Sequence, residues 1–323
     1  MESCIKDWGA CIRWLLVAPL VVLAISAPAQ ERYPLRPIDF IVPFGPGGGA
    51  DQAARKLAQL IEADLKVSFP VLNIPGASGN TGMAKLLTSP ADGQSIVILA
   101  GNAFAQFAIR PPAWKLEDIT ILGIVTNEPS AFFVAYDAPW KTWADVEKAA
   151  KAKPSSLKLA GTGIGSADEL TAGYLSSKGI KLVFVPFAKA SERFLSILGG
   201  HADIMYEQAG DVRSYVENKQ MRPVLFFAPQ RVSNFKDIPA SKELGYDVTL
   251  PQYRVIAVRK GTDPAKLKIL SAAIAKAATS SDFKAFLKGQ WAEENSYLPA
   301  SETEAFVRDE IETIKNILAS MKK

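Results

Sequence analysis

The chain carries the stretch IDFIVPFGPGGGAD at residues 38–51, in which a short apolar run leads into a glycine-rich loop and the start of a helix. A second stretch of the same kind, LKLAGTGIGSA, occupies residues 157–167. Each unit predicts an anion site, because the backbone N–H groups at a helix N-terminus point outward and the helix dipole favours negative charge. Two such units predict a protein that holds a small anion from two sides.

Apolar runs of strand length alternate with helix-like segments along most of the chain, which is typical of an α/β fold. We expect strands at residues 38–42, 69–74, 95–99, 119–125, 131–135, 157–160, 182–185, 203–206, 224–228 and 253–258. Helix starts are expected at Asp51, at Thr142 with Asp145, at Asp263-Pro264 and at Ser301 with Glu304.

The N-terminus has the pattern of a secretory signal peptide. Lys6 and Arg13 precede an apolar stretch at residues 14–27, and Ala27-Pro28-Ala29 follows as a cleavage site. The apolar core is shorter than the roughly 20 residues that span a bilayer, although an uncleaved anchor remains the alternative. We therefore predict a signal peptide at residues 1–29, cleaved near Ala29, and a periplasmic mature protein that begins near Gln30.

The cysteine content and the net charge limit the kinds of site and of partner that we expect. Both cysteines, Cys4 and Cys11, lie in the leader, so the mature protein is expected to have no disulfide, thiolate zinc site or cysteine nucleophile. The net charge is +4 with scattered positive residues, and a nucleic-acid site would need them clustered on one face. The small positive excess is compatible with an anionic ligand or with simple solubility. No nucleic-acid partner is expected.

A dinucleotide site is one alternative for the first loop, because Gly45-x-Gly47-x-x-Ala50 fits the G-x-G-x-x-G/A fingerprint. Pro46 weakens this interpretation, since proline lacks the N–H that a pyrophosphate would need there. The ribose-binding acid expected some twenty residues later is also absent, because Asn73 and Ile74 occupy that place. An NAD-type oxidoreductase therefore stays as an alternative.

Other catalytic chemistry has little support in the sequence. The single histidine, His201, lies in Gly199-Gly200-His201-Ala202-Asp203, which is typical of a turn between a helix and a strand. No Gly-x-Ser-x-Gly elbow supplies a serine nucleophile, and ligands for a zinc site are missing. We expect no catalytic residues, no metal and no cofactor, and we expect that the protein is not an enzyme.

Several motifs together resemble a known family. In order along the chain they are Tyr33-Pro34-x-Arg36-Pro37-Ile38, Val42-Pro43-Phe44-x-Pro46-Gly47-Gly48-x-x-Asp51, Asn73-x-Pro75-Gly76-Ala77-x-Gly79-Asn80, Pro90-x-Asp92-Gly93, Gly163-x-Gly165-Ser166, the residue 199–203 turn, and Gly261-Thr262-x-Pro264. This order is similar to that of the solute receptors of tripartite tricarboxylate transporters, the Bug or TctC family. The resemblance spans essentially the whole mature chain.

The resemblance implies a two-lobed periplasmic binding protein of class II, the Venus-flytrap type, with a mixed sheet flanked by helices in each lobe. Residues 30–130 and 253–323 would form lobe 1, and residues 131–252 lobe 2. A small organic carboxylate would bind in the cleft, and the partners would be membrane permease subunits of a tripartite transporter. A monomer is expected. An exported ligand sensor that signals to a membrane kinase is a further alternative.

The two loops that hold the ligand correspond here to residues 43–51 and 162–166. One ligand carboxylate is expected to accept hydrogen bonds from the first loop, and the other end from the second loop and the Ser166 hydroxyl. The candidate ligand-binding residues are Phe44, Gly47, Gly48, Gly49, Ala50, Asn102, Thr162, Gly163, Gly165, Ser166, Tyr206 and Glu207.

The second loop departs from the family pattern. Relatives often have histidine shortly after the Gly-Ser pair, whereas this chain has Asp168-Glu169-Leu170. If Glu169 faces the cleft, its charge would repel a second ligand carboxylate. If it faces solvent in the first turn of the helix, it is an ordinary acid at a helix N-terminus. The sequence leaves both arrangements open.

Overall fold

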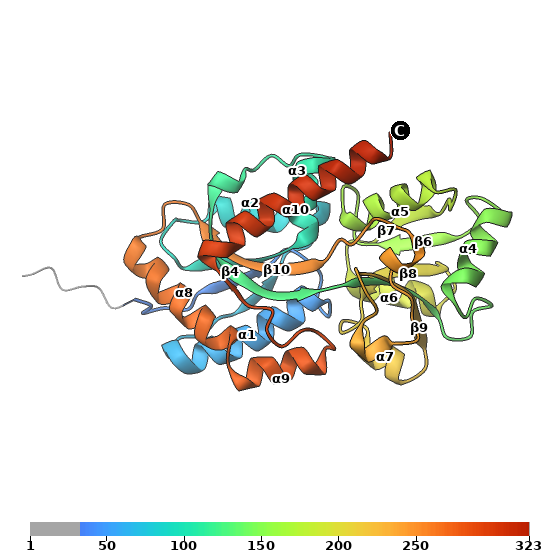
Figure 1. The fold of residues 1–323 in the computed structure, drawn as a ribbon. Helices are drawn as coiled ribbons and strands as arrows, with labels where there is room; N and C mark the ends of the chain where they lie inside the picture. Colours follow the sequence, from blue (N-terminus) through green and yellow to red (C-terminus); the bar gives the residue numbers. More distant parts are fainter. Residues whose placement is uncertain (1–32, 323) are drawn as a thin grey trace, which may run out of the picture. The chain divides into compact units, whose positions relative to one another are not determined.

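The computed structural model describes residues 33–322, and the predicted signal peptide lies outside these residues. The first of two sheets has the strand order β11-β4-β10-β3-β1-β2 (Figure 1). Its strands are β1 (Asp39–Val42), β2 (Val71–Asn73), β3 (Ser95–Ala100), β4 (Ile119–Glu128), β10 (Gln252–Arg259) and β11 (Leu298–Pro299). β1 runs parallel to β2 and β3, while β10 runs antiparallel to β3 and β4, so the sheet is mixed.

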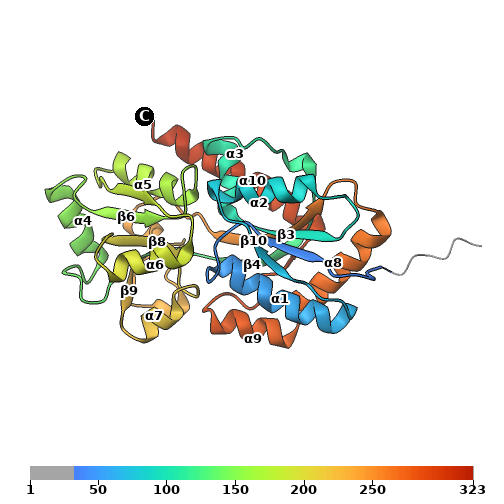
Figure 2. The ribbon, with the colours of Figure 1, turned by 180° about the vertical axis from the view of Figure 1, so that it is seen from behind.

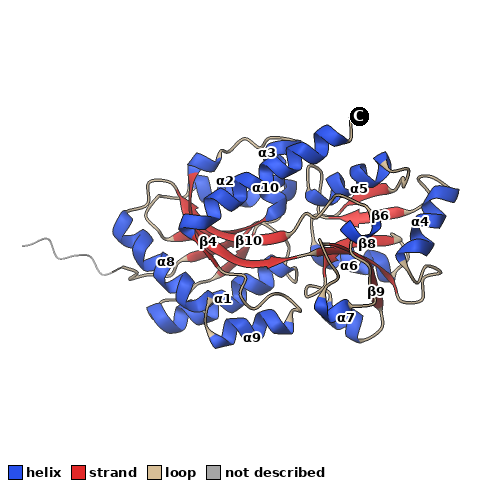
Figure 3. Cartoon of the chain, viewed as in Figure 1, coloured by secondary structure: helices blue, strands red, loops and turns tan. Residues whose placement is uncertain are grey.

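Helices cover both faces of this first sheet (Figure 3). One face packs against α1 (Gly49–Leu65), α8 (Pro264–Ala278) and α9 (Ser281–Gly289), and the other against α2 (Asn80–Thr88), α3 (Gly101–Ile109) and α10 (Ala300–Ser320). The alternation along β3 shows why both faces are apolar: Ile96 and Ile98 enter one core, and Val97 and Leu99 enter the other.

The second sheet has the order β7-β6-β8-β5-β9. Its strands are β5 (Ser130–Ala135), β6 (Lys158–Gly161), β7 (Val183–Pro186), β8 (Ile204–Gln208) and β9 (Met221–Phe227). β6 is parallel to β7 and β8, and β5 is antiparallel to β8 and β9. Helices α4 (Trp143–Ala152) and α5 (Ala167–Ser177) pack on one face, and α6 (Ala190–Leu198) and α7 (Arg213–Glu217) on the other. The expected two-lobed α/β fold with mixed sheets is confirmed.

We call the elements of the first sheet lobe 1 and those of the second lobe 2. Only Pro129 separates β4 from β5, and residues 249–251 return the chain to β10. These two crossings touch, because the Ser130 hydroxyl donates to the Leu250 carbonyl (3.4 Å). The last turns of α10 also reach lobe 2, where Ile314 and Ile317 join the core beneath α5 (Figure 2). The C-terminal helix therefore belongs to both cores.

Two of the predicted helix starts are confirmed by their hydrogen bonds. The Thr142 side chain accepts from the Asp145 backbone N–H, and the Asp145 carboxylate accepts from the Thr142 N–H, which is a capping box. Asp263 accepts from the two N–H groups that follow Pro264, so it caps α8 as predicted. The predicted strand positions are likewise close to those of the structure.

The other two predicted helix starts are wrong. α1 begins at Gly49, and its N-cap is Gly48, which has no side chain to accept a capping hydrogen bond. Asp51 lies in the first turn of the helix, and its carboxylate accepts from the Gly47 N–H (3.0 Å). α10 begins at Ala300, directly after Pro299 ends β11, which leaves Ser301 inside the first turn. None of the helices in residues 33–322 has the length and hydropathy needed to cross a membrane.

The α10 helix carries a carboxyl group that should make stability depend on pH. Burial, with Asp309 beside it, raises the pKa of Glu310 from 4.5 to about 7. Between these values the unfolded chain has lost the proton that the folded chain keeps, so stability falls as pH rises through this window and stays lower above it. Relative to Glu310→Gln, the native protein should lose about 1–3 kcal/mol between pH 5 and pH 8. Denaturant unfolding at both pH values measures this difference.

The matched control is Glu302→Gln, at an exposed position on the same helix. It should follow the pH dependence of the native chain. If Glu310→Gln does so too, the carboxyl of Glu310 is not held in its protonated form by the fold.

Candidate functional site

Two cavities lie where the loops of the two lobes meet. The inner cavity, of about 50 Å³, is bounded by the first loop at Phe44 and Gly49 and by the second at Thr162 and Asp168. The outer cavity, of about 380 Å³, shares Phe44 and Thr162 with it and also reaches Arg110. The two glycine-rich loops thus face one another across the same small space.

The structure distributes the twelve predicted residues unevenly around these cavities. Those that line the inner cavity are Phe44, Gly48, Gly49, Ala50, Asn102, Thr162, Tyr206 and Glu207. Gly163 lines the outer cavity, and Gly47, Gly165 and Ser166 line neither. The role of these residues in binding stays a prediction.

The first loop is braced by side chains of its own lobe. Gly47 has a φ of +84°, a conformation that favours glycine, and its N–H donates to Asp51. Asn73 donates to the Asp51 carboxylate (2.9 Å) and to the Phe44 carbonyl (3.1 Å), at the place where a dinucleotide site would need an acid. Burial opposes ionisation of Asp51, but hydrogen bonds from Arg55, Gly47 and Asn73 lower its pKa overall. The N–H of Gly47 is therefore already used within the loop.

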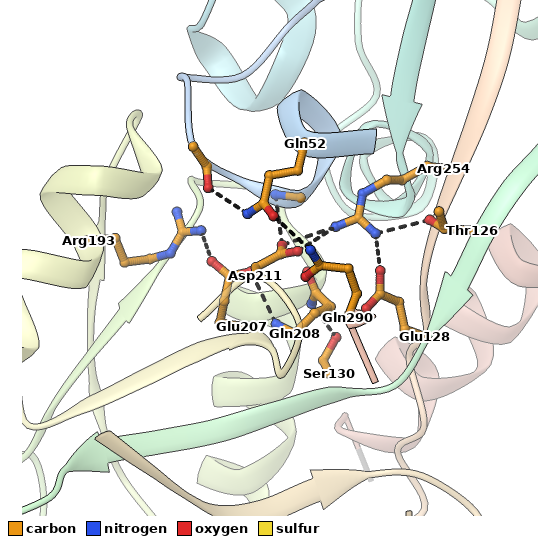
Figure 4. Close-up of polar contacts among 12 residues, drawn as sticks. Gln52, Thr126, Glu128, Ser130, Arg193, Glu207, Gln208, Asp211, Arg254 and Gln290 are labelled. Atoms are coloured by element: carbon orange, nitrogen blue, oxygen red, sulfur yellow. Dashed lines mark hydrogen bonds and ion pairs between the residues drawn. The ribbon is translucent and has the colours of Figure 1, made fainter. Parts of the chain in front are cut away.

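A carboxylate from lobe 2 occupies the N-terminus of α1. The Gly49 N–H, the first of the helix, donates to Asp211 Oδ2 (2.9 Å). Arg254 of β10 donates to the same oxygen through Nη2 (3.1 Å), as Figure 4 shows. The N-terminus of α1 thus holds an acid of the protein itself, and the binding of a ligand anion there stays a prediction.

Backbone N–H groups of the second loop also donate to acids of the protein itself. The Thr162 N–H donates to Asp168 Oδ2 (2.6 Å), and the Gly165 N–H donates to Glu169 Oε2 (2.7 Å). Ser166 is the N-cap of α5, and its hydroxyl accepts from the Glu169 N–H (3.2 Å). Glu169 therefore turns back on its own loop, whereas the neighbouring Asp168 is fully buried and lines the inner cavity.

The two lobes cap each other's helices. Asn102 Oδ1, from lobe 1, accepts from the Ala167 N–H at the start of α5 (3.1 Å), while Asp211, from lobe 2, accepts from Gly49 at the start of α1. We call these two contacts the reciprocal caps. The Ser78 hydroxyl adds a further contact between the lobes by donating to the Ile164 carbonyl (3.0 Å). The lobes are thereby joined directly through the loops that were predicted to hold the ligand.

Two buried guanidinium groups line the inner cavity together with these acids. Arg254 pairs with Glu128 as well as Asp211 and donates to Thr126 Oγ1 (3.0 Å), and Arg193 pairs with Glu207. The side chains of both arginines are at most 6% exposed. Burial raises the pKa values of Glu128 and Asp211 from their ordinary range, although Arg254 acts against this rise.

Sequence reasoning missed the four residues Asp211, Arg193, Arg254 and Glu128. None of them belongs to a recognised motif. The available signal was a charged residue within an apolar run, as in Tyr253-Arg254-Val255-Ile256-Ala257. A charged side chain inside a strand that is buried on both faces must have a partner, so such a position predicts an internal ion pair. In residues 33–322 no group of three His, Cys, Asp or Glu side chains is placed to hold a metal ion.

Gly49 offers a direct test of the cap on α1. A Cβ atom at this position would overlap Arg254 Nη2 and both carboxylate oxygens of Asp211. Gly49→Ala should therefore expel the ion pair from the helix N-terminus and lower the free energy of unfolding by about 1–3 kcal/mol, the usual cost of breaking a buried polar contact. Chemical denaturation provides the measurement. Gly289→Ala, at another helical glycine without a positive φ where a Cβ would make only ordinary contact (3.4 Å, with Arg213 Nη1), is the matched control.

A family model described as the tripartite tricarboxylate transporter family receptor matches residues 53–322. The chain belongs to this family. TctC receptors are periplasmic solute-binding proteins, and they act with the membrane subunits of a transporter. The resemblance seen in the sequence motifs is thus confirmed over most of the chain.

Individual members of the TctC family agree with this assignment. The chain is 28% identical to protein BugT of Bordetella pertussis over 301 residues, which cover 91% of this chain and 92% of BugT. The solved structure of the periplasmic binding protein BugD is 22% identical, with a TM-score of 0.83 over 90% of this chain and 99% of BugD. R. palustris Rpa4515, solved with adipate, is 20% identical, with a TM-score of 0.84 over 90% and 99% of the two chains. These two structures share the fold.

Proposed function

We propose that this receptor captures a small carboxylate in the inner cavity and presents it to the membrane subunits of a tripartite transporter. One observation carries the proposal: the N-terminus of α1 and two buried guanidinium groups, Arg193 and Arg254, line a single cavity between the lobes. Helix N-termini and guanidinium groups both favour carboxylates. The fold neighbour Rpa4515 was solved with adipate, a dicarboxylate, which supports the same ligand class.

The ligand is expected to act by joining the lobes. A volume of about 50 Å³ has room for a few water molecules, so the reciprocal caps must separate for an organic acid to enter. The ligand carboxylate then competes with Asp211 for the Gly49 N–H and the Arg254 guanidinium. Hydrogen bonds to a charged group contribute about 1.5–3 kcal/mol each, and a few of them supply micromolar affinity, about 8 kcal/mol. Pro129 and residues 249–251 are the proposed hinge.

A thermal-shift and calorimetry panel tests the ligand class. Monocarboxylates, dicarboxylates, amino acids, polyamines and NAD are each added at millimolar concentration, and a ligand at a hundred times its dissociation constant should add about 2.7 kcal/mol of stability. A carboxylate-containing ligand should stabilise the protein and be recovered unchanged after incubation. Stabilisation by NAD alone would instead support the dinucleotide alternative.

A variant that fills the cavity separates site binding from binding elsewhere. Ala188 is exposed and lines both cavities, so Ala188→Trp should abolish the ligand response without a cost to the core. Ala152→Trp, at the exposed end of α4, lines neither cavity and should bind as the native protein does. Equal affinity in the two variants would move the binding site away from the interlobe cavities.

The proposed membrane partner needs a separate experiment. Pull-down from detergent-solubilised membranes, with and without a stabilising carboxylate, should recover permease subunits. Recovery of a sensor kinase in their place would support the signalling alternative. Light scattering at the same protein concentration measures whether the receptor is a monomer, as we expect.

A further inference from the structure

The inner cavity holds more acidic than basic side chains. Asp168, Glu207 and Asp211 line it together with Arg193 and Arg254, and Glu128 lies behind Arg254 as its second partner. All six side chains are less than a tenth exposed. With every group ionised, four carboxylates face two guanidinium groups, so a dicarboxylate ligand would raise the buried acids to six. Burying an uncompensated charge is costly, and such a cavity is a poor site for a dianion.

Two acceptor atoms on the walls of this cavity lack partners. Among residues 33–322, neither Asp168 Oδ1 nor Gln252 Oε1 has a hydrogen-bond partner, and both atoms are buried. Asp168 is 0% exposed and Gln252 is 4% exposed, and both residues line the inner cavity. The other Asp168 oxygen already accepts from the Thr162 N–H. An unpaired buried acceptor is expensive, so these two oxygens require a donor that the surrounding protein does not provide.

Two unpaired donors belong to the arginines that line the same cavity. Nε of Arg193 and Nε of Arg254 are buried without a partner within the described part of the chain. A ligand that carries both an acceptor and a donor would therefore match the cavity better than one that carries acceptors alone. A carboxylate supplies the acceptor, and a protonated amine supplies up to three donors together with the positive charge that the acids require.

We propose that the ligand is zwitterionic, a small amino acid or similar aminocarboxylate, whose ammonium group is held by Asp168 and Gln252 while its carboxylate meets the arginines and the N-terminus of α1. This inference rests on the proposed capture of a carboxylate and narrows its substrate class. It makes Asp168, in the first turn of α5 directly after the second loop, a specificity-determining residue.

The electrostatics of Asp168 agree with this assignment. Burial raises the pKa of its carboxyl group, and Glu207 adds to the rise, whereas Arg193 and hydrogen bonds from Thr162 oppose it. The groups that face Asp168 are Arg193 of α6, Glu207 and Tyr206 of β8, and Thr162 in the second loop. A bound ammonium group would stabilise the ionised form, so binding should release protons and tighten as pH rises through the raised pKa.

Matched ligand pairs test the inference by calorimetry on the full chain. The pairs are glutarate with glutamate, succinate with aspartate, and propionate with β-alanine, and putrescine is an amine without a carboxylate. At least one amino acid should bind tenfold or more tightly than its plain partner. Equal or tighter binding of the plain acids would overturn this inference and leave the proposed function intact. Binding of putrescine alone would overturn both the inference and the proposed carboxylate capture, and so would no binding at all.

Variants identify the residue responsible. Asp168→Asn should weaken the amino acid at least tenfold and reduce its preference over the plain acid. Glu169→Gln is the matched control, because this neighbouring acid lines neither cavity. Gln252→Leu removes the second acceptor and gives an independent readout if Asp168→Asn does not fold, as judged by circular dichroism. Unchanged selectivity in every folded variant would refute the assignment.

Discussion

Replacing Arg254 by methionine should lower the free energy of unfolding by about 3–5 kcal/mol at pH 7, because removing one member of a buried ion pair leaves its partners uncompensated. Arg254 holds two acids, Glu128 and Asp211, and all three side chains are less than a tenth exposed. Methionine fills a similar volume without the charge. Urea denaturation followed by circular dichroism measures the loss.

The pH dependence of this loss in stability shows whether uncompensated buried carboxylates cause it. Burial already raises the pKa values of Glu128 and Asp211, and the loss of Arg254 should raise them further. Both acids then bind a proton on folding, so the variant should recover stability as pH falls below 7. Arg308→Met is the matched control, since Arg308 is 51% exposed and pairs on the surface of α10. It should cost less than about 1 kcal/mol. A loss in Arg254→Met as small as this control would contradict the buried network.

Replacing Asp211 by alanine should separate the lobes when no ligand is added. The variant leaves the Gly49 N–H and Arg254 Nη2 without the acceptor that they share when the lobes meet. Each unpaired buried group costs about 1–3 kcal/mol, whereas water satisfies it once the lobes part. The population should therefore shift toward separated lobes by about ten- to a hundredfold.

Spin labels on α1 and α6 can detect this separation. Gln59 and Leu195 are exposed, and replacing Cys4 and Cys11 by serine leaves only the two introduced cysteines to react. The distance distribution should lengthen in Asp211→Ala and be partly restored in Asp211→Asn, which keeps an acceptor for Gly49. Asp247→Asn, at an 81% exposed position in lobe 2, should match the native distribution. A native distribution in Asp211→Ala would show that other contacts hold the lobes.

The fold could be predicted from the sequence because the apolar patterns of single segments and the order of motifs along the chain indicate the same architecture. Alternating apolar residues such as Ile96 and Val97 place a helix layer on each side of a strand, and the order of motifs indicated the family. Helix starts were predicted correctly where a side chain caps the helix, as at Thr142. They were wrong at α1 and α10, where the N-caps are Gly48 and Pro299 and no side chain accepts a capping hydrogen bond.

The site was only partly predictable, for a physical reason. The glycine-rich loops could be found because their backbone conformation needs glycine over a short stretch of sequence. Asp211 and Arg254 could not, because the contact between them joins residues 43 positions apart from different lobes. Which of Asp168 and Glu169 faces the cavity could not be predicted, because adjacent side chains on a helix point in different directions. These directions follow only from the place where α5 begins, which is given by its N-cap, Ser166.

The reciprocal caps have a consequence for the speed of loading. Asp211 holds the start of α1 to lobe 2, and Asn102 holds the start of α5 to lobe 1. In the proposed mechanism a solute enters only after these contacts, and that of Ser78 with Ile164, have broken, and that step does not involve the solute. In stopped-flow experiments the observed rate should rise with solute concentration and then level off at the opening rate. At a high external concentration of the solute, the rate of transport would then be limited by the opening rate of this receptor.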